Sequence, residues 1–114
     1  STTIDGAYED MKQYLSKKEA AYCIFSDNDM IALGAMKAMA EFGIGFGDVS
    51  IVGFDDLTFS SISYPPLTTL RVPKQEMGRA VVRRLRDMLK DNDGIKLKMQ
   101  MCTQFIERES VKKI

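Results

Sequence analysis

Short strand-like runs that alternate with helical patterns constrain the fold of this chain more than any other feature. The runs 21–25 and 49–54 are largely apolar, and a third strand-like run covers 67–72. Short apolar runs suit strands that are covered on both faces, as in a parallel sheet. Because helices and strands alternate along the chain, we predict a single α/β domain over residues 1–114, with a mostly parallel sheet flanked by helices.

Helical spacing of apolar residues predicts three helices, over Ile4–Lys18, Met30–Phe42 and Pro73–Lys90. Thr3 and the polar cluster 26–29 are suited to cap the first two helices, and Gly43 is a natural stop. Lysines alternate with apolar residues over 96–101, which predicts a half-exposed strand. The following residues 104–106 are expected to extend that strand or pair with it.

The composition argues against an enzyme. The chain has no histidine, which is the commonest general base, and it lacks a Gly-x-Ser-x-Gly elbow. Gly43, Gly45 and Gly47 precede a strand, whereas a phosphate-binding loop follows one. The formal net charge is zero, so no global field attracts the chain to DNA or membranes. Cys23 and Cys102 lie in strand-like runs and are predicted to be buried, reduced thiols.

Polar side chains follow the first two predicted strands, as Asp27-Asn28-Asp29 and Asp55-Asp56. Ligands of open α/β sheets bind beyond the carboxyl ends of the strands, and carboxylates and amides suit the hydroxyls of a sugar. The same residues also suit helix caps and a turn. A third interpretation is a magnesium or calcium site, or a receiver domain. The pattern by itself leaves these interpretations open.

Two further features could carry contacts with partners. Arg79, Arg83, Arg86 and Lys90 share one face of the last predicted helix, which could bind an acidic partner or could simply be the solvated face opposite an apolar stripe. The loop 62–66 is unusually apolar, and exposed apolar loops often mark interfaces. Several methionines and a leucine of the second helix suit either the core or a self-association surface: Met30, Leu33, Met36 and Met39.

An ordered set of motifs then resembles one family. The motifs are residues 28–36 (Asn-Asp-Met-Ile-Ala-Leu-Gly-Ala-Met), Gly43, 49–56 (Val-Ser-Ile-Val-Gly-Phe-Asp-Asp), 65–70 (Pro-Pro-Leu-Thr-Thr-Leu), Met77-Gly78 and 107–110 (Glu-Arg-Glu-Ser). Their order and spacing resemble the effector-binding core of the lactose/galactose/purine-repressor (LacI/GalR) family over nearly the whole chain.

The resemblance implies a fold like that of periplasmic sugar-binding proteins, in which two α/β lobes enclose a ligand cleft. Residues up to about Pro66 would belong to the C-terminal lobe, and 67–91 would be an excursion into the other lobe. The DNA-binding domain would be absent. Asn28 and Asp55 match positions at which family members hydrogen-bond the effector.

The resemblance also favours a homodimer through the second helix and the apolar loop, with contacts at Leu33, Met36, Ile62 and Tyr64. Arg83 matches a position where some members dock a phosphorylated carrier protein, although Gln75 departs from the aromatic residue expected beside it. Val72 stands where some sugar-binding members have glutamine, which leaves the identity of the sugar open.

We therefore expect the effector-sensing and dimerisation portion of a cytoplasmic transcription regulator, with no catalytic residue, metal, cofactor or membrane contact. Its effector would be a sugar or related small molecule, and operator DNA would be bound only through the absent domain. The alternative is a periplasmic or secreted sugar-binding protein of the same fold. Because the apolar stripe of the last helix suits a lobe that is mostly absent, we expect that helix to fold back, dimerise or exchange with a partner. We also expect the isolated chain to bind an effector weakly.

Overall fold

The computed structural model describes residues 2–17, 21–91 and 94–113. Lys18, the predicted end of the first helix, lies outside these described residues, and so do residues 92–93 of the turn predicted after the last helix. The elements in chain order are α1 (Ile4–Ser16), β1 (Cys23–Phe25), α2 (Asp29–Glu41), β2 (Ser50–Asp55), α3 (Thr58–Ile62), β3 (Thr68–Arg71), α4 (Lys74–Asp91) and β4 (Gln104–Ile106).

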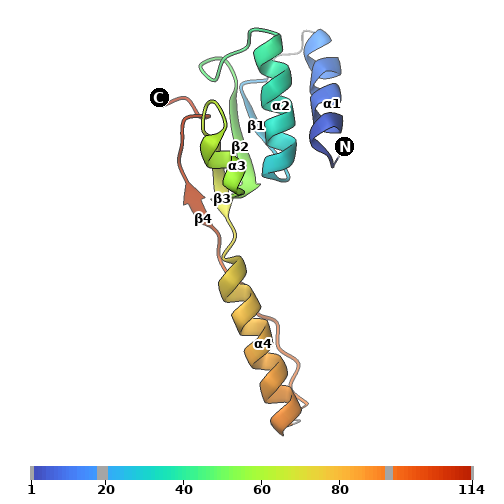
Figure 1. Cartoon of the computed structure of the whole chain (residues 1–114), viewed down its shortest axis with the longest axis vertical. Helices are drawn as coiled ribbons and strands as arrows, with labels where there is room; N and C mark the ends of the chain where they lie inside the picture. Colours follow the sequence, from blue (N-terminus) through green and yellow to red (C-terminus); the bar gives the residue numbers. More distant parts are fainter. Residues whose placement is uncertain (1, 18–20, 92–93, 114) are drawn as a thin grey trace.

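The four strands form one sheet in the order β1-β2-β3-β4. β1 pairs with β2 and β2 with β3 in parallel, and β4 pairs with β3 antiparallel. The prediction of an α/β fold with a mostly parallel sheet is therefore confirmed. The sheet, α1, α2 and α3 form one body, from which α4 projects along the longest dimension of the molecule (Figure 1), which measures 60 Å.

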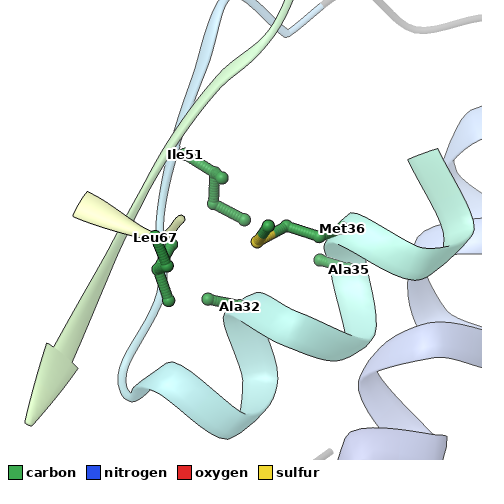
Figure 2. Close-up of a cluster of buried hydrophobic side chains, with 5 residues drawn as sticks. All are labelled: Ala32, Ala35, Met36, Ile51 and Leu67. Carbon is green, nitrogen blue, oxygen red and sulfur yellow. The ribbon is translucent and has the colours of Figure 1, made fainter. Parts of the chain in front are cut away.

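Small and flexible apolar side chains form the core between α2 and one face of the sheet. The cluster consists of Ala32, Ala35, Met36, Ile51 and Leu67. Figure 2 shows the three α2 residues facing Ile51 of β2 and Leu67 at the entry to β3. Because alanines line this side of α2, the helix axis can approach the sheet closely.

α1 packs against the outer side of α2, and a glycine allows that contact. A Cβ atom at Gly34 of α2 would overlap the backbone carbonyl oxygen of Ile4 and lie 3.1 Å from the Cβ atom of Ala7. Backbone atoms of a helix cannot move aside as a flexible side chain can. The sequence therefore needs glycine at this position for packing, even though glycine weakens a helix.

The second face of the sheet is exposed at both of its edges. Phe25 of β1 is 63% exposed and Phe105 of β4 is 56% exposed, and Cys23 shares the face of Phe25. Both cysteines are exposed free thiols, so the prediction that they are buried is wrong. The expectation of strands covered on both faces fails at these edges, because no helix among the described residues packs on Phe25 or Phe105.

Residues 96–101 do not form the strand that their alternating pattern predicts. They run extended beside α4 (Figure 1), and no strand among the described residues is adjacent to pair with them. Arg84 donates to the carbonyl oxygen of Ile95 at 2.6 Å, which holds the start of this segment to the helix. An alternating pattern needs a pairing partner before it becomes a strand.

The apolar stripe of α4 is exposed, and the helix does not fold back onto the sheet. The stripe comprises Met77, Val81, Leu85, Met88 and Leu89. Of the three outcomes expected for this helix, folding back is therefore not observed, and dimerisation or exchange with a partner stays a prediction. None of the helices in ranges 2–17, 21–91 and 94–113 is long and apolar enough to cross a membrane.

We expect Gly34→Ala to destabilise the fold by roughly 1–3 kcal/mol, because the added Cβ overlaps the backbone of α1. Gly47→Ala is the matched control, since a Cβ atom there meets nothing within 4 Å. Its effect should stay within about 0.5 kcal/mol. Urea unfolding followed by circular dichroism measures both. Equal free energies of unfolding for the two variants would contradict the packing role of Gly34.

Candidate functional site

The carboxyl ends of β1 and β2 meet at one edge of the sheet, as expected for parallel neighbours. Ser26, directly after β1, donates its N–H to the carbonyl oxygen of Val52 at 2.9 Å. The segment 26–29 therefore lies beside the end of β2, where Asp55 and Asp56 follow. The five polar residues of this edge have different environments, which separate structural roles from candidate ligand contacts.

Asn28 caps α2. Its backbone is extended, and its Oδ1 accepts a hydrogen bond from the N–H of Ile31 at 3.0 Å. An Asn cap of this type contributes about 1 kcal/mol to stability. Asn28 thus has a structural role, and the half-buried side chain also lies at the expected edge of the sheet. Asp27, beside it, is exposed.

Asp29 is fully buried and is committed to the fold. Its Oδ2 accepts from the N–H of Leu57 at 2.8 Å and from Ser60 Oγ at 2.5 Å. Its Oδ1 accepts from Thr69 Oγ1 at 2.5 Å. The carboxylate stands in the first turn of α2, where the helix dipole favours negative charge. Both oxygens are engaged, so Asp29 does not serve a ligand.

Asp55, the last residue of β2, has a left-handed backbone with φ of 107°. Its carboxylate is half-buried. Oδ1 lies 3.5 Å from Nζ of Lys74, the first residue of α4, and the same Nζ donates to the carbonyl oxygen of Asp55 at 3.3 Å. This carboxylate remains partly open to solvent at the edge where a ligand is expected.

Asp56 also has a left-handed backbone, with φ of 52°, but its carboxylate is paired. Arg71 Nε donates to Oδ2 and Arg108 Nη2 donates to Oδ1, each at 2.6 Å. The Asp56 side chain is only 8% exposed. Burial by itself raises the pKa of Asp56, but the hydrogen bonds and charges of the two arginines outweigh it and hold that pKa below the usual carboxyl range.

Three cations contact Asp55 or Asp56 that the sequence pattern did not predict for this site: Arg71, Lys74 and Arg108. Arg71 could have been found from its position, because it is the charged residue at the end of the third strand. In the sheet it is the register partner of Asp55. Arg108 lies 52 residues from Asp56, so no local spacing could connect the two. It belongs to the motif 107–110 that carries the resemblance, yet nothing in that motif tells which carboxylate it meets.

The carboxylates do not form a metal cage. Among residues 2–17, 21–91 and 94–113, no group of three or more His, Cys, Asp or Glu side chains is placed to hold a metal ion. Asp29 is engaged by neutral donors and Asp56 by arginines. A magnesium site at this edge would need to break those contacts first.

The residues predicted at a dimer interface separate into two groups. Met36 is 5% exposed and lies in the core cluster, so its prediction as an interface residue is wrong: the side chain faces the sheet. Leu33 is half-buried against the same cluster. Ile62 and Tyr64 are 75% and 98% exposed.

A shallow groove of about 390 Å³ lies beside Tyr64. Its lining also includes Ala40, Ile44, Phe46 and Pro65. The exposed ring of Tyr64 and this apolar lining are compatible with an interface, so the interface role of Ile62 and Tyr64 stays a prediction. Arg83 is exposed on α4, and its docking role stays a prediction.

Comparisons with known proteins agree on one family. Residues 1–111 match the family described as the periplasmic binding protein-like domain. The HTH-type transcriptional repressor PurR of Vibrio atlanticus (strain LGP32) is 34% identical over 101 residues, which cover 88% of this chain and 30% of the repressor. The chain spans about a third of the length of the curated relatives that it matches.

Two solved structures show the same arrangement of elements. The lac repressor dimer bound to operator and the anti-inducer ONPF superposes with a TM-score of 0.87 at 30% identity, over 96% of this chain and 38% of that chain. A LacI family transcriptional regulator from Enterococcus faecium with bound ribose gives a TM-score of 0.86 at 26% identity, over 97% and 41%.

Asp29→Ala should lower the free energy of unfolding by roughly 3 kcal/mol or more, because three donors lose their partner and each costs roughly 1–3 kcal/mol when left buried and unpaired. Asp27→Ala, which removes an exposed carboxylate two residues away, should change it by no more than about 0.5 kcal/mol. Denaturant unfolding at neutral pH compares the two variants. A mild effect at Asp29 would mean that its bonds contribute little.

Proposed function

Because the chain belongs to the family of periplasmic binding protein-like domains found in LacI-type regulators, we propose that it senses a small hydroxylated molecule as part of a transcription regulator. The observation that carries this proposal is Asp55. It is held in a left-handed backbone at the carboxyl end of a parallel strand, with a half-buried carboxylate beside a cation. Ligands of α/β sheets collect at this edge.

The chemistry of this edge suits hydroxyl groups. The Asp55 carboxylate accepts hydrogen bonds only, so it pairs with the O–H donors of a sugar. Oδ1 of Asn28 is engaged in the helix cap, so a ligand at Asn28 would meet its amide N–H groups. One acceptor and one donor from adjacent strand ends can fix the orientation of a ring that carries both kinds of partner.

In this proposal the chain supplies one wall of the ligand cleft. Segments outside it would supply the second wall and the DNA-binding part, since the relatives are about three times as long. Such a regulator would act in the cytoplasm. It would bind operator DNA as a dimer, as the lac repressor dimer does. A secreted or periplasmic sugar-binding protein of the same fold is the second candidate. A helix-turn-helix in the longer protein would favour the regulator, and a signal peptide would favour the second candidate.

D-ribose is a suitable first probe, because the Enterococcus faecium structure holds bound ribose. We expect it to shift the amide resonances of 27–28 and 55–56 in the ¹⁵N-labelled chain, with a dissociation constant on the order of millimolar because only one wall is present. Asp55→Asn should weaken this binding at least about tenfold, since a hydrogen bond to a charged group contributes roughly 1.5–3 kcal/mol. Asparagine tolerates the left-handed backbone, so the variant tests charge.

Asp91→Asn is the control for that titration, because it removes an equal charge from the exposed end of α4. Other pentoses and hexoses, tested in the same way, define the preferred ring. Shifts that arise elsewhere, or that survive Asp55→Asn unchanged, would contradict the ligand role of Asp55.

The exposed residues Ile62 and Tyr64 support a dimer contact as part of the same proposal. We expect Ile62→Glu to raise the dimer dissociation constant at least about tenfold, because a charge would be buried in an apolar contact. Gln13→Glu on α1 is the control on an exposed site. Sedimentation velocity over a concentration series measures the change.

The exposed stripe of α4 offers the competing contact, so Leu85→Glu is measured alongside. Dissociation by Leu85→Glu alone would assign self-association of this chain to α4. A chain that remains monomeric at all concentrations would contradict both contacts.

A further inference from the structure

Two consecutive residues at the end of β2 have a left-handed backbone conformation, which residues other than glycine rarely adopt. Asp55 and Asp56 have φ of 107° and 52°, and neither is glycine. Left-handed conformations are unfavourable for residues with a Cβ atom, although aspartate tolerates them better than most. Two in succession persist only where surrounding contacts hold them.

The contacts that hold this turn converge on the Asp56 carboxylate. Arg71 and Arg108 bind one oxygen each, at 2.6 Å. Arg108 is itself fixed: its Nη1 donates to the carbonyl oxygen of Leu67 at 2.7 Å, and its backbone N–H donates to Thr68 Oγ1 at 2.9 Å. With a side chain only 15% exposed, Arg108 is the firmer of the two anchors, since Arg71 is half-exposed.

Arg71 stands where β3 leads into α4, and Arg108 lies beyond the far end of the strand on which the chain returns from α4. Arg71 ends β3, and α4 begins three residues later. Arg108 follows β4, the strand at which the chain returns from α4. Arg71 and Gln104 are register partners, so the ends of β3 and β4 that lead to and from α4 are adjacent. A single carboxylate thus joins the turn that carries Asp55 to the end of β3, where α4 begins, and to the segment that follows β4.

We propose that Asp56 is a positioning residue, which through Arg71 and Arg108 holds Asp55 in the left-handed backbone that presents its carboxylate to a ligand. The inference rests on the proposed ligand role of Asp55. Asp56 itself does not touch the ligand, because both of its oxygens are occupied. Through Arg71 the same contacts tie the geometry at Asp55 to the end of β3, where α4 begins.

The test reads the φ angle of Asp55 directly, in the full chain without ligand, from backbone scalar couplings in NMR spectra. Asp56→Asn removes the charge but favours a left-handed backbone as well as aspartate does. We expect the couplings of Asp55 to move towards those of ordinary extended residues. Arg108→Lys should retain most of the original couplings, whereas Arg108→Gln should lose them. Glu76→Gln, which removes a carboxylate from an exposed pair on α4, should leave them unchanged.

A pH titration of the unaltered chain gives a second readout that a merely structural role would not move. A carboxyl whose pKa is lowered on folding stabilises the fold above its unfolded pKa, and that contribution is lost as the pH falls through the lowered, folded value. The couplings of Asp55 should therefore hold down to about pH 4 and change only below it, when Asp56 takes up a proton. This titration decides the matter if Asp56→Asn does not fold.

Binding of D-ribose to the same variants completes the experiment. Asp56→Asn should weaken it at least about tenfold. Arg108→Lys should keep most of the binding that Arg108→Gln loses. Unchanged couplings of Asp55 in a folded Asp56→Asn chain would overturn the positioning role. Failure of the unaltered chain to bind D-ribose or any other sugar, with the couplings responding as expected, would instead count against the proposed function of Asp55.

Discussion

The buried carboxylate of Asp29 is the contact on which the arrangement of this molecule depends. It joins the first turn of α2 to the start of α3 and to the middle of β3, through donors that lie 28 to 40 residues away in the chain. Gly53 of β2 passes so close to this carboxylate that a Cβ atom would overlap it. The segments that follow β1 and β2 are thereby fixed to β3, at the edge of the sheet where Asp55 lies.

Three aspartates at this edge, Asp29, Asp55 and Asp56, show how one residue type serves different purposes. Asp29 and Asp56 are almost inaccessible and their oxygens are all engaged, whereas Asp55 remains half-buried with one weak ion pair. A carboxylate that must bind a ligand has to remain available, but its backbone has to be rigid. The neighbouring, fully bonded carboxylates supply that rigidity.

Periodicity predicted much of this architecture, and its failures have physical causes. Three helices, α1, α2 and α4, and the parallel strands were predictable because their apolar pattern is local, whereas the short α3 lies in a predicted loop. The strand over 96–101 was not formed, since pairing depends on a neighbour that the sequence pattern does not specify. Exposure of Cys23 followed from a sheet face that is exposed at its edge. The meeting of Asp56 with Arg108 depends on the complete topology, so the site could be predicted only as far as its acidic half.

The paired attachment of α4 has a mechanical consequence. α4 is connected to the sheet at both ends of its excursion, through β3 and β4, which lie side by side. Two adjacent connections oppose twisting of α4 about its own axis more than one connection would. Through Arg71, Asp56 holds the end of β3 to the turn that carries Asp55. A movement of α4 relative to the sheet would therefore originate beside Asp55, which forms an ion pair with Lys74, the first residue of α4.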